Sequence, residues 1–305
     1  MPRITFHAGR LHAEIDTSFG ACLTDFSIDG PFNDRYPILR RAAADLDHPG
    51  RSASFPLAPW TNRIAGAAFS FAGQSHTLRP NFPDGTAIHG DTFGRAWRIT
   101  DRTPVSARLV FDSRAHADIN FPFPFACVHR FELSPQDLRV DLSVTNVGEV
   151  DMPAGCGMHP HFCRRLFCEA DAVEVRAPVS GRYPADACIP TGPAQPDDAC
   201  AKLSAGGPLG DPALDDCFAG FGGRAEITWP ASGVRVSMDC SPELSHLVVF
   251  TPRNDRGPMP WFCVEPVTMA NDAFNLETRG IAAGVRTLAP GETLATSVTF
   301  HVQTS

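Results

Sequence analysis

The chain has 305 residues, of which 43% are hydrophobic and 20% charged, with a formal net charge of −8. This composition is ordinary for a folded globular protein and excludes a disordered chain. The negative charge and the lack of any Lys/Arg run argue against nucleic acid or an anionic membrane surface as a partner. The 28 Pro and 25 Gly leave little room for long helices, so we expect one all-β domain spanning residues 1–305.

The first twenty residues alternate short apolar and polar stretches and contain no apolar run behind a positively charged start. We therefore expect no secretory signal and a cytoplasmic protein. No stretch approaches the length of a membrane span. The ten cysteines are scattered along the chain and no pair has the C-x-x-C spacing of a zinc site, so we expect reduced, mostly buried thiols.

Apolar and polar residues alternate with a period of two along most of the chain, which predicts strands. Residues 128–133 and 138–146 read as a hairpin across the turn at 134–137. Residues 225–240 repeat this arrangement, and residues 293–302 form a closing strand after a turn at 289–291. The Pro-rich and Gly-rich segment 184–212 is expected to be a long surface loop that borders a site. Because sheets with one apolar face bury it against another sheet, we predict a large β-sandwich or barrel-like fold.

A few polar residues break this pattern. The motif "APWTNRIAG" places Asn62 and Arg63 between an aromatic and an aliphatic residue, and "AIHGD" places His89 before a glycine. "ALDDCFAGF" places two Asp residues inside an apolar run, and "WFCVEP" ends an apolar strand on Glu265. A buried carboxylate of that kind is costly without a partner and is a typical position for a tuned general base.

Each of these residues also has a structural interpretation. Arg63 could equally form a structural salt bridge. His89 could be a loop histidine whose ring bonds the backbone. Either Asp could cap a turn. Glu265 could also end an edge strand with its carboxylate in solvent.

The stretch "GMHPHF" places His159 and His161 two residues apart, so that in a strand both side chains point to the same face. One hypothesis is a metal chelate. The other hypothesis is that only one imidazole takes part in a reaction and that Pro160 fixes the backbone beside it. A cupin-type site would supply a Glu about four residues after the second His. In this chain the first Glu after His161 is Glu169, so the spacing does not match. We therefore expect no metal.

Taken together, the motifs of this chain resemble those of the aldose 1-epimerases, or galactose mutarotases. The motifs in chain order are "NRIAG", "AIHGDTFGRAW", "GMHPHF", "LDDCF", "FCVEP" and "LAPGETL", and they cover nearly the whole chain. The stretch "SFPLAPWTNRI" is similar to the bacterial aldose-epimerase-like subgroup. The resemblance implies a single galactose mutarotase-like β-supersandwich. It also implies a cofactor-free interconversion of the α and β anomers of a free aldose.

The resemblance also implies a role for individual residues. Glu265 would be the base at the C1 hydroxyl and His159 the acid at the ring oxygen. Arg63 and His89 would hydrogen-bond the sugar and stabilise charge on its oxygens, and Asp215 would bind ring hydroxyls.

Three neighbouring residues complete the motifs. Asn62 joins the substrate-binding motif, Asp216 falls on a variable position and is left out, and His161 occupies an aromatic-or-His position beside the acid. We expect the acid to carry a proton near neutral pH, favoured by a nearby carboxylate.

Two alternatives stay open. A hexose-6-phosphate 1-epimerase would need a basic cluster for the phosphate, which Arg51, Arg63, Arg95 and Arg98 could provide. A non-catalytic carbohydrate-binding module on the same fold would not need a matched acid and base. In each case the expected partner is a small-molecule sugar, and the chain is expected to be a monomer or a homodimer.

Overall fold

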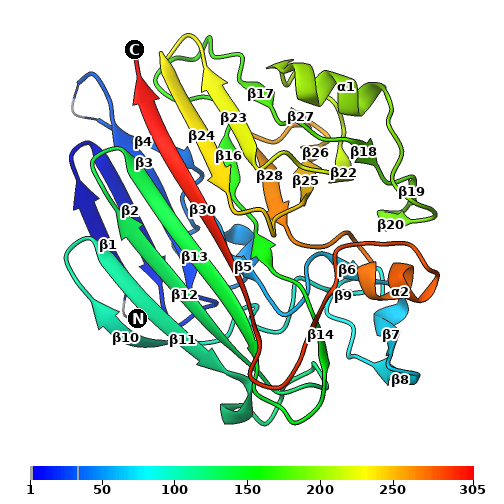
Figure 1. The fold of residues 1–305 in the computed structure, drawn as a ribbon. Coiled ribbons are helices and arrows are strands. Elements are labelled where there is room, and N and C mark those ends of the chain that lie inside the picture. The colour runs from blue at the N-terminus through cyan, green and yellow to red at the C-terminus, as the bar shows by residue number, and fades with distance from the viewer. Residues whose placement is uncertain (1–2, 33) are drawn as a thin grey trace.

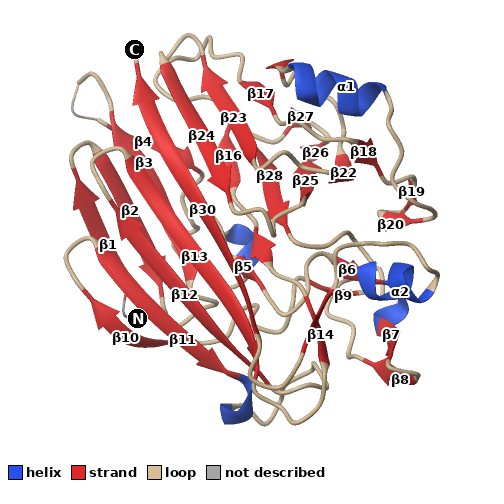
Figure 2. Cartoon of the chain, viewed as in Figure 1, coloured by secondary structure: helices blue, strands red, loops and turns tan. Residues whose placement is uncertain are grey.

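The computed structural model describes residues 3–32 and 34–305, and it confirms the all-β class. Two large sheets stack on one another, with most strand pairs antiparallel, and the helices lie at the periphery (Figures 1 and 2). Neither helix of this described part is long and apolar enough to cross a membrane.

The larger sheet has eleven strands. Its order is β1 (Arg3–Ala8), β2 (Leu11–Asp16), β3 (Cys22–Asp29), β4 (Arg35–Leu39), β16 (His161–Cys163), β28 (Trp261–Val267), β25 (His246–Phe250), β22 (Asp215–Ala219) and β18 (Gly181–Arg182), with β15 (Gly157–Met158) paired to β28 and to β5 (Pro56–Leu57).

The second sheet has nine strands. Its order is β10 (Arg98–Arg102), β11 (Ser106–Asp112), β12 (Phe125–Leu133), β13 (Asp137–Asn146), β30 (Thr293–Thr304), β24 (Val234–Cys240), β23 (Arg224–Trp229), β17 (Glu174–Arg176) and β21 (Gly207–Pro208).

The remaining elements are short. The two-stranded pairs are β6 (Arg63–Ile64) with β9 (Ala87–Ile88), β7 (Ala68–Phe71) with β8 (Gln74–Thr77), β14 (Met152–Ala154) with β29 (Arg286–Leu288), β19 (Ala185–Asp186) with β20 (Ile189–Pro190), and β26 (Arg253–Asn254) with β27 (Gly257–Pro258). The helices are α1 (Asp198–Ala205) and α2 (Ala273–Thr278), and single 3-10 turns cover Pro49–Arg51, Ala65–Ala67 and Ser113–Ala115.

Aromatic side chains fill the space between the two sheets. Phe300 on β30 contacts Phe26 on β3, with ring centroids 5.9 Å apart, and Phe162 on β16 at 6.3 Å. The indole Nε1 of Trp229 on β23 donates to the carbonyl of Cys163 at 2.9 Å. Each fully buried Phe contributes about 2 to 3 kcal/mol by its removal from water, so these contacts fix how the sheets stack.

The hairpins expected from the alternating pattern are confirmed. Leu133 pairs with Leu138 across the first turn, Trp229 pairs with Val234 across the second, and β30 closes the second sheet between β13 and β24. The expectation for residues 184–212 is wrong in part, because this segment contains the β19–β20 hairpin and helix α1. Residues 198–205 contain neither Gly nor Pro, and the side chain of Asp197 caps the helix by accepting from the backbone N–H of Cys200.

The central strands β3, β25 and β28 are buried along nearly their whole length, so both faces of the larger sheet are covered there. One face packs on the second sheet. Residues 53–57 extend this sheet in its own plane, because β5 pairs with β15 and because Phe55 and Ala53 accept backbone hydrogen bonds from His159 and His161. On the face opposite the second sheet, the β6–β9 segment and strands β22 and β28 line one cavity. Polar side chains on this face are enclosed, and Glu265 is only 2% exposed. All ten cysteines are free, and six of them are buried.

Candidate active site

Strand register brings the two carboxylates of the predicted site to one face of the larger sheet. Asp215 on β22 aligns with Phe250 on β25, which in turn aligns with Cys263 on β28. Glu265 lies two residues after Cys263 on the same strand. Because side chains two residues apart share a face, Asp215 and Glu265 both point to the covered side of the sheet.

The two histidines of "GMHPHF" join the same face. His161 on β16 pairs directly with Cys263 on β28, and His159 precedes it by two residues. The backbone N–H of His159 donates to the carbonyl of Phe55 at 3.1 Å, which holds the residue beside the neighbouring segment of the sheet that leads into β5.

Asp216 faces away from this site. It aligns with Val249 on β25 and forms an ion pair with Arg182 at 3.2 Å. The period of two along β22 thus separates two adjacent carboxylates, one into the site and one to the reverse face of the sheet.

Arg63, Asn62 and His89 come from the β6–β9 pair. Arg63 aligns with Ile88, and the backbone N–H of His89 donates to the carbonyl of Asn62 at 3.0 Å. Asn62 and His89 both have left-handed backbones, with φ of 49° and 64°. Such conformations are uncommon for residues other than Gly and are typical of sites where the surrounding structure fixes a side chain.

Gly90 makes this arrangement sterically feasible. Its φ is 83°, and a Cβ placed on it would lie 2.0 Å from the carbonyl oxygen of Ala58. The backbones of residues 58 and 90 therefore approach more closely than any side chain at position 90 would allow.

All six residues that the sequence singled out line one cavity of about 160 Å³. They are Asn62, Arg63, His89, His159, Asp215 and Glu265, and the other lining residues are His48, Gly50, Phe55, Phe82, Ile88, Phe93, His161, Phe250 and Trp261. The structure thus brings together residues that lie as far as 203 positions apart in the sequence, from Asn62 to Glu265.

The ring of His159 is held by neighbouring rings. It stacks on Phe55 and on His161, with centroids 4.6 Å apart in both cases, and it meets the edge of His89 at 5.1 Å. Its Nε2 lies 3.3 Å from Oε1 of Glu265. Phe55 has no signal of its own in the sequence beyond its place in "SFPLAP", and only the structure identifies it as part of the site.

Burial sets the protonation of this pair. It lowers the pKa of His159 to about 3, helped by the positive charge of Arg40, and it raises the pKa of Glu265 well above its usual range, with Asp215 adding to the effect. The expectation that a carboxylate keeps His159 protonated is therefore wrong. The low-dielectric surroundings disfavour both charges more than the pair can stabilise them, so the shared proton lies on Glu265.

A polar network holds the opposite side of the cavity. The Nε of Arg63 donates to Asp84 at 3.0 Å, and its Nη1 lies 3.7 Å from Asp215 and donates to the side-chain oxygen of Asn62 at 3.3 Å. The thiol of Cys188 donates to the same Oδ2 of Asp215 at 3.0 Å. Cys188 lies in the turn between β19 and β20, and no motif in the sequence marks it.

The hypothesis of a metal chelate is not supported by ring geometry. His159, His161 and Cys263 have potential ligand atoms within 4.8 Å of one another. However, the two imidazoles are stacked with their planes only 24° apart. A metal bound by both nitrogens would have to lie close to both ring planes, which nearly parallel stacked rings do not permit.

Several buried polar atoms of the cavity have no hydrogen-bond partner within the described part of the chain. They are Nδ1 of His89, Nδ1 of His159 and Oε2 of Glu265. Buried polar atoms are nearly always hydrogen-bonded in native proteins. A ligand with several donors and acceptors would satisfy these three atoms.

Comparison with known proteins shows which chains this one resembles. The family profile of aldose 1-epimerase matches residues 2–301. The uncharacterized protein YphB of Escherichia coli K12 is 27% identical over 289 residues, covering 90% of this chain and 92% of YphB. A solved structure described as a candidate aldose 1-epimerase from Escherichia coli K12 has a TM-score of 0.84 and 26% identity, covering 100% of this chain and 99% of the other. The structure of a galactose mutarotase-like protein from Clostridium acetobutylicum has a TM-score of 0.84 and 22% identity, covering 99% of this chain and 95% of the other. At this identity it supports the fold alone.

Proposed function

The chain belongs to the aldose 1-epimerase family, and we propose that it interconverts the α and β anomers of a free aldose by acid–base ring opening and reclosure. The observation that carries this proposal is the enclosed pair of His159 and Glu265, 3.3 Å apart, with one polar atom of each unpartnered. An acid and a base held together in a cavity match what ring opening requires.

The reaction moves one proton in each direction. Glu265 takes the proton of the C1 hydroxyl while His159 delivers a proton to the ring oxygen, so the C1–O5 bond breaks and C1 becomes a carbonyl. Rotation about the C1–C2 bond then presents the other face of the aldehyde. In reclosure His159 takes the proton back from the C5 hydroxyl as its oxygen attacks C1, and Glu265 returns a proton to the new C1 hydroxyl.

The pair carries one proton throughout this cycle. With a closed sugar bound the proton lies on His159, and with the open-chain aldehyde it lies on Glu265. Burial by itself favours the second arrangement, because it raises the pKa of Glu265 and lowers that of His159. A sugar hydroxyl that donates to the carboxylate stabilises its charged form, which favours transfer of the proton to the imidazole.

Three further residues are assigned to the substrate. Arg63 and His89 reach the cavity from the β6–β9 pair, where they can donate to sugar oxygens that gain charge as the ring opens. Asp215 offers a carboxylate acceptor for ring hydroxyls. Asn62 holds Arg63 in place through its side-chain oxygen, which accepts from both the backbone N–H and the guanidinium of Arg63.

A neutral sugar fits the charges around the cavity better than a phosphosugar. Arg63 is the single cationic residue that lines it in the described chain, and it is engaged by Asp84 and Asp215. Arg51 is paired with Asp45 and Asp47, and Arg95 with Asp91 and Asp118. Arg98 begins β10 at the edge of the second sheet and does not line the cavity. The four arginines therefore do not form the free basic cluster that a phosphate needs.

The test is anomer-resolved NMR of freshly dissolved α-anomers of galactose, glucose, xylose, arabinose and glucose 6-phosphate. Wild type is compared with Glu265→Gln and His159→Asn, and with His129→Asn as the matched control. His129 is also a fully buried histidine, but it lies on β12 of the second sheet. Thermal unfolding of each variant checks that it is folded.

We expect wild type to accelerate equilibration of a free aldose. Loss of the acid or the base should lower kcat by about 10²-fold to 10⁴-fold. The His129 variant should keep its rate. Sugar-dependent thermal stabilisation without any acceleration would instead identify a non-catalytic binding module and overturn the proposal. Acceleration of glucose 6-phosphate alone would overturn the choice of a free sugar.

A further inference from the structure

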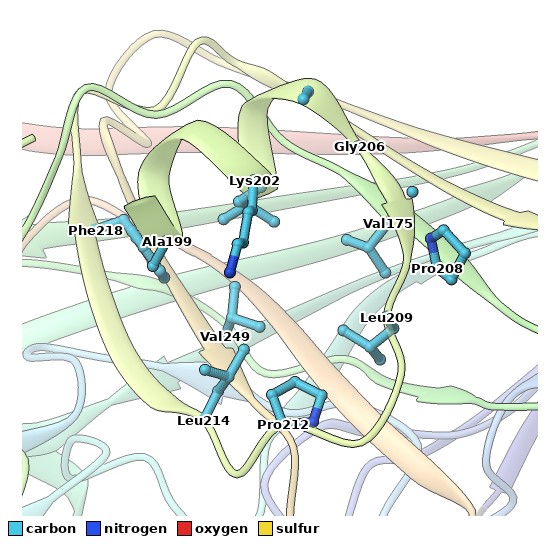
Figure 3. A pocket seen from close by; sticks show the side chains of 13 residues that line it. Val175, Ala199, Lys202, Gly206, Pro208, Leu209, Pro212, Leu214, Phe218 and Val249 are labelled. Carbon is cyan, nitrogen blue, oxygen red and sulfur yellow. The ribbon is translucent and has the colours of Figure 1, made fainter. Parts of the chain in front are cut away.

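A second cavity lies at the open end of the sandwich, away from the candidate active site. It measures about 500 Å³, and Figure 3 shows the side chains that line it beneath α1. Figure 1 shows α1 beside β17 of the second sheet and β18 of the larger sheet. Val175 comes from β17 of the second sheet, whereas Phe218 on β22 and Val249 on β25 come from the larger sheet. Val249 pairs with Asp216, so it lies on the reverse face of the sheet from Asp215.

The lining of this cavity is almost entirely apolar. Its floor consists of Val175, Phe218 and Val249, each less than 5% exposed. Its walls carry Leu203 on α1, with Leu209 and Leu214 in the following loop, all of them half-buried. Lys202, Ala205 and Pro208 of its lining are exposed, so the cavity opens to solvent. Cavities of about 300 to 1,000 Å³ with apolar walls and a few polar groups are typical of small-molecule sites.

Hydrogen bonds tie both walls of the cavity to the sheets. On the α1 side, the backbone N–H of Ala177 donates to the carbonyl of Leu203 at 2.9 Å, and that of Val179 donates to the hydroxyl of Ser204 at 3.1 Å.

The loop wall is held in the same way. The backbone N–H of Leu209 donates to the carbonyl of Val173 at 2.8 Å, and that of Leu214 donates to the hydroxyl of Thr251 at 2.8 Å. Because both walls are anchored, the cavity is formed before any ligand arrives, which lowers the entropic cost of binding.

One charged group faces this apolar surface. Lys202 is the only lysine in the sequence, and it is the one charged residue among those that line the cavity in the described chain. Figure 3 shows its side chain descending from α1 with the amine directed toward Val249 and Leu214. No hydrogen bond or ion pair of this amine occurs among the described residues.

We propose that this cavity binds a small amphipathic monoanion, with an alkyl or aryl body against the leucines and a carboxylate on the ammonium of Lys202. The positive charge of Lys202 favours a ligand with a negative charge, and the apolar walls favour a ligand with an apolar body. An ion pair at the mouth of an apolar cavity fixes the orientation of such a ligand while its tail supplies most of the affinity. This site is independent of the proposed epimerase activity.

The test is isothermal titration of the full chain with decanoate, compared with decanol and decyltrimethylammonium of the same chain length. The variants are Lys202→Met, which removes the charge; Lys202→Arg, which keeps it; and Ala199→Trp, which fills the cavity from α1. Circular dichroism and the thermal midpoint of each variant verify the fold.

We expect saturable binding of one decanoate per chain. Lys202→Met should weaken it by about fivefold, the strength of a partly exposed ion pair, while Lys202→Arg retains it. Ala199→Trp should abolish binding if the fold is intact. The wild-type protein should bind decyltrimethylammonium more weakly than it binds decanoate.

Three results would overturn the proposal. They are no saturable binding of decanoate, equal affinity in wild type and Lys202→Met, and a concentration-dependent dimer whose dissociation is required to expose the site. Light scattering across the same concentration range measures the last of these.

Discussion

The pH dependence of anomer interconversion is the sharpest test of how burial acts on the catalytic pair. Burial lowers the pKa of His159 to about 3 and raises that of Glu265 well above its usual range. The pair therefore keeps one proton from about pH 3 upward to the raised pKa of Glu265. We expect kcat/KM, which reports the free enzyme, to show no loss through protonation of His159 as the pH falls from 7 to 5.

The magnitude follows from the titration of one imidazole. If His159 had the ordinary histidine pKa near 6.5, the fraction of enzyme with a single proton on the pair would fall roughly 25-fold between pH 7 and pH 5. With a pKa of about 3 the same change in pH would remove only about 1% of that form. The two cases differ by more than tenfold at pH 5.

The assay is anomer-resolved NMR in buffers from pH 4.5 to pH 8, with the rate of buffer alone subtracted at each pH. Stability must be checked in parallel, because burial also lowers the pKa of His129 to about 3 and that of His246 to about 4. Their folded pKa values lie below the unfolded value, so the unfolded chain binds more protons and stability falls as the pH drops below about 6.5. A fall in kcat/KM centred near pH 6.5, in protein that circular dichroism shows to be folded, would refute this account of the pair.

Three substitutions test other parts of the site. Asp215→Asn should lower kcat/KM by about 10-fold to 100-fold through the loss of a charged acceptor, whereas Asp216→Asn, on the reverse face, should stay within about twofold; equal losses would contradict the face assignment. Cys188→Ala should raise KM by about two- to fivefold because Asp215 loses a donor, and Cys188→Ser should restore it; the same KM in both variants would show that the thiol has no part in positioning. Gly90→Ala should cost at least about 2 kcal/mol in urea unfolding because its Cβ would overlap the carbonyl of Ala58, and an unchanged midpoint would show that the backbone adjusts freely.

The sequence by itself predicted the main hairpins and six of the residues that line the candidate site. Alternation with a period of two is a local property, so the hairpins at 128–146 and 225–240 could be predicted without knowledge of their neighbours. The ordered motifs marked the six residues around the cavity, and the structure brings all six together.

The tertiary structure alone decided the electrostatics of that site. Desolvation depends on everything packed around a group, and for His159 this includes Phe55, which stacks on its ring, and Arg40, whose charge lies close by. Sequence patterns therefore favoured a protonated imidazole, whereas the enclosed site favours a neutral one.

The parts with no motif were also decided by tertiary packing. Cys188 reaches Asp215 only because the turn between β19 and β20 folds over the end of β22, and the cavity beneath α1 is lined by residues from both sheets. Neither feature leaves a periodic trace in the sequence, since both arise from contacts between segments distant along the chain. Local periodicity determines where strands form and which side chains share a face. Only the packing of those faces determines the protonation of buried side chains, their contacts and the position of cavities.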